Sequence, residues 1–498
     1  MVKIAKQASQ KCTLNKPLYC PKNGAHLKDL IAFIKEIETS YNVSSITANG
    51  IQVWPFLRNV YGLRYEGQTR PIEMLPFIKK AERVKNMFYG LGDMFRRYKY
   101  LVFSDSSERR MINGKYLDKI SEYLVNVLGK DNVLIIEAPA DGLHYRRSQI
   151  SSKHIISSDV FRFLHYFFFP SIKGVSINNA EIISELNKKY ELNVNYRNII
   201  FSFFSLEKLF RLFYKVWLPE AIFINCSYSI VHQASLYTAK SMGIKTIELQ
   251  HGIINKKHPA YNVFTKLDNN FFPDYLFVFG DYVKDVFSTY NYFISKENVF
   301  SIGNMYLDYI KNEYNPDDST AKLFSEFRRE YKKIVAVSSQ ITVEKKLINF
   351  LNKSANLNKE ILYIFIPRDL NKDYSSVSFA DNIILLKDKR LDVYKIIKES
   401  DFHSTVSSTC ALEAPALGIP NVLINIDNLA KYYYSDLLLD SDITRFVDTP
   451  EEYVKVLISW HPIGKEEIIY RHRHFYKQNH KESLMQALGA IGIERNVA

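Results

Sequence analysis

Short apolar runs, rich in β-branched and aromatic residues, recur along this chain, and most of them stop at a polar turn before a helix-like stretch begins. The runs of the first half comprise residues 100–103, 132–136, 220–225, 244–249, 275–279 and 299–302. Those of the second half comprise residues 333–337, 361–365, 383–386 and 422–426. Strands that alternate with helices are typical of parallel sheets, whose ligands bind at the carboxyl ends of the strands.

The 498 residues are enough for two domains of ordinary size, each with its own core. The two series of strands therefore predict an α/β chain in which two Rossmann-like domains face a central cleft. We place the domains at residues 1–315 and 316–498. Within the first domain, residues 155–218 are expected to form an aromatic and basic helical insertion.

In this insertion, apolar residues recur at helical spacing with cations between them. The apolar residues are Leu206, Leu209, Phe210 and Phe213, and the cations are Lys208, Arg211 and Lys215. Two interpretations stay open. The helices either face the core and expose a solvated basic side, or form a patch that docks on an anionic membrane surface.

The formal net charge of +13 favours an acidic partner, which is a nucleic acid, an anionic membrane surface or a phosphate-bearing substrate. No run of about 20 uncharged apolar residues occurs, and the first residues lack an apolar core of signal-peptide length, so we expect a cytoplasmic protein. The four cysteines show no Cys-x-x-Cys spacing, which predicts neither a disulfide nor a zinc site.

One strand ends in Gln250-His251-Gly252. A glycine at a strand end lets the backbone approach a ligand closely, and an imidazole beside it can donate to a phosphate or act as an acid or base. The alternative is a turn that contains a satisfied histidine.

A second segment places Ser407, Ser408 and Thr409 where a strand end passes into a helix that begins near Cys410. Such a loop offers hydroxyls and free backbone N–H groups to a diphosphate. Glu413 lies on the first helical turn, where a carboxylate can reach a ribose hydroxyl pair. The alternative is an ordinary helix cap.

The pattern Ser-Ser-Thr-x-x-x-Glu-Ala-x-x-x-Gly-x-Pro resembles the donor-nucleotide segment of GT-B glycosyltransferases. Gln-His-Gly resembles a motif of capsule and lipopolysaccharide transferases, which include Kdo-transferase-like, polysialyltransferase-like and CDP-polyol phosphotransferase-like enzymes. The resemblance covers roughly residues 220–430. It implies a nucleotide-sugar donor in the C-terminal domain and an acceptor on the N-terminal one, with the last helices crossing back by analogy.

The resemblance also implies residue roles. His251 and Gly252 would lie at the interdomain cleft, and the donor phosphates and ribose would contact Ser407, Ser408, Thr409 and Glu413. Arg368, in Ile366-Pro367-Arg368, stands where sialyltransferase-like members carry a His-Pro pair. An arginine can clamp phosphate in a bidentate manner, but the missing histidine argues against a CMP-sialic-acid donor.

Transfer needs a base for the acceptor hydroxyl, or a nucleophile if the sugar configuration is retained. Asp105 and Glu108 follow the first strand and are candidates, with Arg109 nearby for anionic groups of the acceptor. Asp141 and His144 form a second candidate set. Helix capping is the alternative for each of these carboxylates.

Trp54 and Arg58 belong to an early block that could stack on and clamp an acceptor sugar, or simply begin a packed helix. No Asp-x-Asp triplet occurs at a strand end, so we predict metal-independent transfer without a cofactor besides the donor substrate. Arg368, lysines and helix N-termini would then balance the charge of the diphosphate.

The sequence therefore predicts a glycosyltransferase that extends a surface polysaccharide or a lipid-linked acceptor, in capsule or O-antigen synthesis, in the cytoplasm or peripherally at the inner face of the plasma membrane. One alternative is an isomerase resembling UDP-sugar 2-epimerases, which share the fold and a similar donor segment. A non-catalytic nucleic-acid-binding protein is the other, but no recognisable motif supports it, and we predict no nucleic-acid partner.

Overall fold

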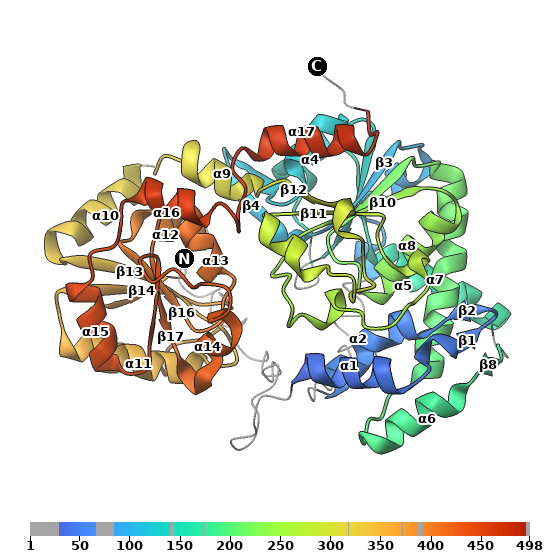
Figure 1. Cartoon of the computed structure of the whole chain (residues 1–498). Helices are drawn as coiled ribbons and strands as arrows, with labels where there is room; N and C mark the ends of the chain where they lie inside the picture. The colour runs from blue at the N-terminus through green and yellow to red at the C-terminus, as the bar shows by residue number, and fades with distance from the viewer. Residues whose placement is uncertain are drawn as a thin grey trace, which may run out of the picture.

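The computed structural model describes residues 29–65, 84–139, 144–172, 175–316, 318–369, 372–386 and 392–494. Two parallel sheets, each covered by helices on both faces, form two Rossmann-like domains that lie side by side (Figure 1). The expectation of an α/β chain with two such domains is confirmed.

The N-terminal sheet has seven strands in the order β12-β11-β10-β9-β3-β6-β7, and all neighbouring pairs are parallel. The strands are β3 (Tyr100–Asp105), β6 (Val133–Ala138), β7 (Ile155–Ser157), β9 (Ala221–Ile224), β10 (Lys245–Leu249), β11 (Tyr275–Val278) and β12 (Val299–Ser301). Because the chain moves from one side of β3 to the other between β7 and β9, the sheet has a topological switch point between β3 and β9.

The C-terminal sheet has six parallel strands in the order β15-β14-β13-β16-β17-β18. They are β13 (Lys333–Ser338), β14 (Ile361–Ile366), β15 (Ile383–Leu385), β16 (Phe402–Thr405), β17 (Asn421–Ile424) and β18 (Thr444–Val447). Counted along the chain, this is the order 3-2-1-4-5-6 of dinucleotide-binding domains. Its switch point lies between β13 and β16.

Both sheets are apolar on both faces, which explains why their strands are continuous apolar runs in the sequence. Leu101 and Phe103 of β3 pack into one core, whereas Tyr100 and Val102 face another on the opposite side. The strand β13 divides its residues between two further cores in the same alternating way.

Helices cover these faces. In the N-terminal domain they are α1 (Leu30–Ser40), α2 (Trp54–Tyr65), α4 (Glu122–Leu128), α5 (Asp159–Leu164), α6 (Ala180–Lys189), α7 (Tyr196–Trp217) and α8 (Ile230–Ser241), with the 3₁₀ segments η2 (Leu91–Phe95) and η5 (His165–Ile172). The later helices are α9 (Met305–Asn312), α10 (Asp318–Glu330), α11 (Glu344–Leu357), α12 (Val393–Glu399), α13 (Cys410–Ala416), α14 (Leu429–Tyr434), α15 (Pro450–Ser459), α16 (Lys465–His472) and α17 (His480–Ala490).

The segment expected to be a helical insertion, residues 155–218, is more varied. It contains β7, a strand of the main sheet, and the long crossover helix α7 that leads to β9. It also contributes β8 (Ile177–Asn178) to a small antiparallel sheet with β1 (Thr47–Ala48) and β2 (Ile51–Gln52).

A hairpin, β4 (Arg109–Ile112) and β5 (Lys115–Asp118), follows β3 directly. Its turn residues Asn113 and Gly114 have φ values of 49° and 78°, which suits the Asn-Gly pair of a two-residue hairpin loop. The hairpin carries cationic side chains from the carboxyl end of β3 toward the C-terminal domain.

The chain passes between the domains twice, and the two passages touch. The first follows β12 at Gly303, which has φ of 77° and whose missing Cβ would lie 2.4 Å from the carbonyl oxygen of Lys477. The second leads into α17, whose first residue, His480, donates its backbone N–H to Asp308 of α9 at 2.7 Å. The helix α17 then packs against the N-terminal sheet beside α4 (Figure 1).

Candidate active site

The switch point of the C-terminal sheet is bridged by two side-chain contacts between Gln340 and Ser407. The amide of Gln340 donates to the Ser407 carbonyl oxygen at 2.7 Å, and the Ser407 hydroxyl donates to the Gln340 amide oxygen. One step earlier, the Thr405 hydroxyl donates to the Ser338 carbonyl at 2.8 Å. These contacts fix the loop between β16 and α13 at the place where ligands bind in open α/β sheets.

That loop presents its polar groups around the start of α13. Thr409 has helical dihedral angles and no capping bond, and its hydroxyl donates instead to the Glu413 carboxylate at 3.3 Å. Among the described residues, the backbone N–H groups of Ser407 and Thr409 make no hydrogen bond. The Ser408 carbonyl accepts from Tyr434 at 2.6 Å. The loop can therefore offer these two N–H groups and the Ser408 hydroxyl to an anionic group, since the Ser407 and Thr409 hydroxyls already donate within the protein.

Glu413 is buried, with 6% of its surface exposed. Its second oxygen accepts a hydrogen bond from the Tyr394 hydroxyl at 2.9 Å. Tyr394 lies on α12, so the carboxylate is held between two helices and keeps one orientation.

Across the interface, Gln250 shapes the turn that carries His251. The Gln250 amide oxygen accepts from the Phe279 N–H at 2.7 Å, and its amide nitrogen donates to the Gly252 carbonyl at 2.8 Å. Apart from its two chain neighbours, no atom of the described residues lies within 4 Å of a Cβ added at Gly252, so the backbone there has open space beside it. The glutamine ties the turn to β11 and so positions the imidazole.

Only one ring nitrogen of His251 has a hydrogen-bond partner among the described residues. Its Nε2 lies 3.3 Å from the Tyr228 hydroxyl, and its buried Nδ1 has no hydrogen-bond partner among the described residues. Burial lowers the pKa of His251, and the charge of Lys119 lowers it further against the opposing effect of Glu108. The ring is therefore neutral at pH 7 and can accept a proton.

The pKa values of the candidate carboxylates after β3 shift in opposite directions. Burial raises the pKa of Asp105, and the charges of Glu108 and Glu137 add to this, although its bond from the Ser107 N–H opposes it. For Glu108, burial also raises the pKa, but Lys119 and Arg110 outweigh it and leave the pKa below the usual value. The Lys119 ammonium lies 3.0 Å from Glu108, which is thus held ionised in an ion pair.

The β4–β5 hairpin brings these groups to the C-terminal domain. Arg110 lies 3.7 Å from Asp392, the residue that caps α12, and the Lys119 ammonium lies 5.6 Å from the centre of the Tyr394 ring. Glu108, Lys119, Tyr394 and Glu413 therefore form a series of neighbours across the domain interface, and His251 lies close enough to Glu108 for their charges to interact. A second bridge joins Lys257 to Asp436 at 3.2 Å.

Two predicted acceptor residues lie elsewhere. Trp54 and Arg58 are buried in the N-terminal core, and both donate to Glu38, at 3.0 and 2.7 Å respectively. Arg58 also donates to the carbonyl oxygens of Pro259 and Asn262. Contrary to the expectation of an acceptor contact, these side chains are enclosed and hold the loop after His251 against α1 and α2.

Arg109 is a third correction. Its side chain is buried and pairs with Glu137, while its other nitrogens donate to Ser152 and Tyr116. The arginine is satisfied inside the domain, so it does not face an acceptor. Its neighbour Arg110, by contrast, reaches the domain interface.

The remaining candidates are dispersed. His144 contacts Glu137 and Ser157 at 2.9 and 2.8 Å, inside the N-terminal domain, and Asp141 lies outside the described residues. Arg368 is exposed immediately after β14. In the described part of the chain, no group of three or more His, Cys, Asp or Glu side chains is placed to hold a metal ion.

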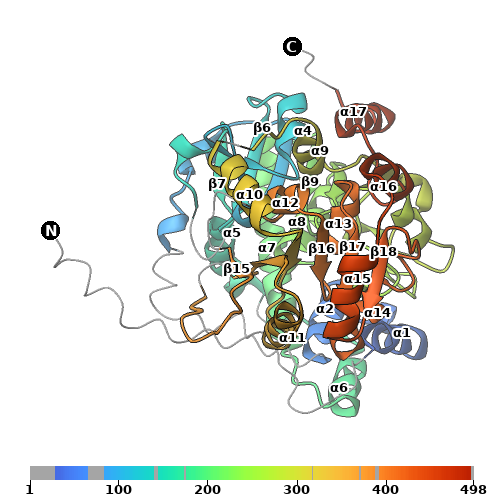
Figure 2. The ribbon, with the colours of Figure 1, turned by 90° about the vertical axis from the view of Figure 1, so that its left-hand side faces the viewer.

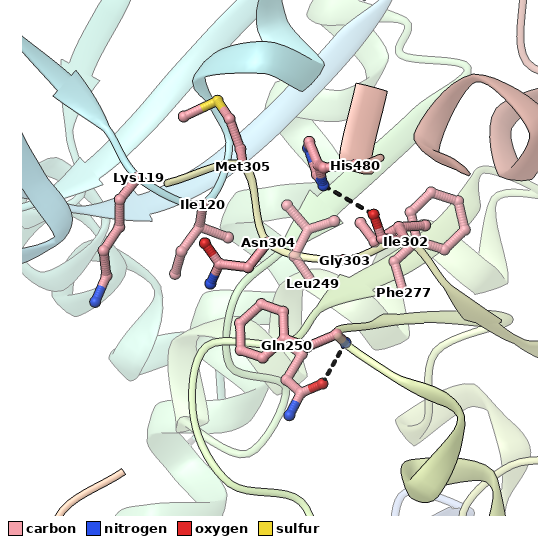
Figure 3. Close-up of a pocket in the computed structure, with 11 residues that line it drawn as sticks. Lys119, Ile120, Leu249, Gln250, Phe277, Ile302, Gly303, Asn304, Met305 and His480 are labelled. Carbon is pink, nitrogen blue, oxygen red and sulfur yellow. Dashed lines mark hydrogen bonds between the residues drawn. The ribbon is translucent and has the colours of Figure 1, made fainter. Parts of the chain in front are cut away.

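A small pocket lies behind these strand ends, beside the two interdomain passages (Figure 3). Lys119 and Gln250 line it from the side of the candidate site, and Asn304, Met305 and His480 close it from the other. His480 donates from Nδ1 to the Ile302 carbonyl at 3.0 Å. The pocket therefore separates the candidate site from the passages.

Several residues of the site were not predicted: Lys119, Tyr228, Gln340, Tyr394 and Asp392. Asn113-Gly114 is a hairpin signal that could have placed Lys119 beside Glu108. The partners of Tyr394 and Asp392 lie far away in the sequence, which contains no local signal for them.

No protein-family model matches the chain, and no curated protein matches it in sequence. Solved structures to which it is similar include S. aureus MnaA with UDP, at 11% identity over 79% of this chain and 96% of that one, with a TM-score of 0.47. The UDP-GlcNAc 2-epimerase of Neisseria meningitidis bound to UDP-GlcNAc aligns at 11% identity over 78% and 99%, with a TM-score of 0.45. A variant of the wall teichoic acid polymerase TagF aligns at 14% identity over 82% and 96%, with a TM-score of 0.46. These similarities are too low to support an argument about this chain. The description of the fold and of the candidate site therefore depends only on the strand order and the contacts of the chain itself.

Proposed function

We propose that this protein is a glycosyltransferase that moves a sugar from a nucleotide-activated donor to a saccharide or lipid-linked acceptor. The observation that carries the proposal is the series of contacts from Glu108 through Lys119 and Tyr394 to Glu413, together with the charge interaction between Glu108 and His251. Together they join a neutral imidazole at the strand ends of one Rossmann-like domain to the switch-point loop of the other.

The C-terminal loop would hold the donor. A diphosphate at the start of α13 would take hydrogen bonds from Ser407, Ser408 and Thr409, and Glu413 would accept from the ribose hydroxyls through its free lone pairs. Arg368 at the end of β14 would supply charge to the phosphates. Binding needs no large rearrangement of Glu413, because Tyr394 already orients it.

His251 would act as the base that takes the proton of the acceptor hydroxyl. If Nε2 carries the proton and donates to the Tyr228 oxygen, the lone pair of Nδ1 is left for the acceptor. Asp105, with its raised pKa, is a second candidate base. Glu108, which is ionised and paired, would instead orient Lys119 and modulate the pKa of His251.

The acceptor would be a surface polysaccharide or its lipid-linked precursor, in capsule or O-antigen synthesis. Support for this finer statement is the resemblance carried by Gln250-His251-Gly252, which the contacts of Gln250 make a rigid turn.

A donor screen followed by a transfer assay tests the proposal. Thermal shifts with CMP-, CDP-, UDP- and GDP-activated sugars identify the donor, because a ligand that binds the native state stabilises it. We expect His251→Ala to keep the donor-induced shift and to lower transfer by roughly 10²–10⁴-fold. The control is His461→Ala, an exposed histidine on the C-terminal domain. Unchanged transfer by His251→Ala would remove the proposed role of the imidazole.

Incubation with donor alone separates transfer from isomerisation. A transferase leaves the sugar nucleotide unchanged until an acceptor is added, whereas an epimerase converts it without one. If the donor is epimerised in the absence of an acceptor, the protein is an epimerase and the proposed transfer reaction is wrong. The proposed binding site for a sugar nucleotide would still stand.

A further inference from the structure

One outer surface of the N-terminal domain exposes large apolar side chains from three segments. Phe88, Leu91 and Phe95 come from the stretch before β3, Tyr166 and Phe167 from η5, and Leu212 and Val216 from α7. The exposed fractions of Phe95 and Phe167 are 78% and 79%. We call these residues, together with Arg96, Arg97 and Lys215, the aromatic-basic patch.

The three segments are held together by direct contacts. Asn86 donates to Asp159 at the start of α5 at 3.3 Å, and the indole of Trp217 at the end of α7 donates to the Met94 carbonyl at 2.7 Å. The segment η5 packs along α7. Figure 2 shows the light-blue stretch before β3 beside α5, on the same side of the domain. The patch is therefore one surface along the β7 edge of the sheet.

On the side that faces the core, the helix α7 is covered by other parts of the protein. Leu206, Leu209 and Phe210 are buried, whereas Leu212, Lys215 and Val216 recur at three- and four-residue spacing on an exposed stripe. Packing against the core therefore describes the buried face of α7, and the interpretation as a docking patch concerns only its exposed face. Its exposed stripe mixes apolar and cationic side chains.

The charge of the patch is positive. Arg96, Arg97 and Lys215 are exposed and belong to no ion pair among the described residues. Two further arginines of these segments are paired with carboxylates, Arg162 with Asp159 and Arg211 with Glu207. An anionic and partly apolar surface complements this arrangement.

We infer that the aromatic-basic patch docks the protein on the surface of an anionic phospholipid bilayer. Aromatic rings settle at the boundary between headgroups and acyl chains, and the arginines and the lysine reach the lipid phosphates. No described helix is long and apolar enough to cross a bilayer, so the attachment is to one face of it. The contacts between the domains use other elements, so docking is independent of the proposed transfer reaction.

Sedimentation of the full chain with lipid vesicles tests the inference. We expect binding to vesicles that contain phosphatidylglycerol and much weaker binding to pure phosphatidylcholine. The double variant Phe95→Ser with Phe167→Ser should bind roughly tenfold more weakly or worse, since each ring loses its apolar burial. Tyr290→Ser with Leu439→Ser is the matched control, because these side chains are equally exposed, at 81% and 77%, but lie outside the patch.

The charge contribution is tested separately. Arg96→Gln, Arg97→Gln and Lys215→Gln should each weaken binding to the anionic vesicles by roughly fivefold and leave binding to neutral vesicles unchanged. Binding to neither vesicle, or binding that the phenylalanine variant leaves intact, would overturn the inference. A dimer in solution that the same variant dissociates would also overturn it, because the patch would then join two copies of the chain.

Discussion

Gln340 and Ser407 are joined by two hydrogen bonds across the switch point of the C-terminal sheet, from the end of β13 to the end of β16. Neither residue is in a regular element, so the pair adds to the Thr405–Ser338 bond in fixing where the loop before α13 begins. The position of the loop groups that we propose as donor contacts depends on it.

We therefore expect Gln340→Ala to weaken donor binding by roughly tenfold, because about two hydrogen bonds of ordinary strength no longer order the loop. Isothermal titration with the donor found in the screen measures this change. Gln486→Ala, on the exposed side of α17, is the control. An unaltered dissociation constant would show that the loop is ordered without the bridge.

The pH dependence of transfer should report His251. Its pKa lies below 6.5, so the rate stays constant from pH 8 toward 6.5 and falls only at lower pH, as the base becomes protonated. Lys119→Met removes a positive charge that lowers this pKa, and the acidic limb should move to higher pH. The control is Lys115→Met in the same hairpin. A limb that moves to lower pH, or not at all, contradicts the assigned base.

Tyr228 should act as a positioning residue for His251. Tyr228→Phe removes the group that lies 3.3 Å from Nε2, and we expect kcat to fall by about tenfold while the dissociation constant of the donor stays unchanged. A variant with lower donor affinity and unchanged kcat would instead place Tyr228 at the donor.

Arg58 should be a stability residue rather than an acceptor contact. Arg58→Ala leaves the buried Glu38 carboxylate without its cation, which costs about 3–5 kcal/mol in the free energy of unfolding. Arg64→Ala, near the end of the same helix, should cost no more than about 0.5 kcal/mol. Urea denaturation measures both. A stable Arg58→Ala protein with a raised acceptor KM would restore the acceptor role.

The protein should lose stability in mild acid. Burial lowers the pKa of four histidines to about 4, namely His232, His258, His403 and His472. The unfolded chain takes up these protons near pH 6.5, so between pH 6.5 and 4 each such group lowers stability by up to about 1.4 kcal/mol per pH unit as the pH falls. Burial raises the pKa of Glu248 to about 7, which opposes the trend by one proton between pH 7 and 4.5.

His403 provides the check on this effect. It donates from Nδ1 to Asn421 and accepts from Ser338, both at 2.8 Å, and it is fully buried. Urea denaturation of His403→Gln at pH 7, 6 and 5 should give a shallower loss of stability than the parent chain. An identical slope would mean that this histidine titrates normally in the folded state.

The main sheets could be predicted because their strands are buried on both faces and so appear as unbroken apolar runs with polar ends. Residues 100–103 and 361–365 lie within β3 and β14 for this reason. The strand β7 was not predicted, because only its three residues Ile155–Ser157 pair with β6 and so short a strand gives no periodic signal. Its residues were instead included in the helical insertion predicted for residues 155–218.

The candidate site could be proposed from the sequence only where one strand and its turn carry the whole motif. Ser407 and Glu413 share such a segment, and His251 follows its strand directly. The ion pair of Glu38 with Arg58 joins two helices, and the contact of Lys119 with Tyr394 joins two domains. Pairings of this kind arise from tertiary packing, so a polar residue that looks functional can equally be a satisfied core group.

The two passages between the domains also determine how the site can open. Gly303 and Lys477 touch, and His480 bonds to Ile302 and Asp308, so both covalent connections leave the N-terminal domain at one place. Two adjacent connections oppose sliding of one domain past the other. Rotation of the domains about that place is then the relative motion that costs least energy. If the proposed donor enters through such a rotation, His251 and Glu413 separate, and the ion pairs of Arg110 with Asp392 and of Lys257 with Asp436, which join the two domains, break.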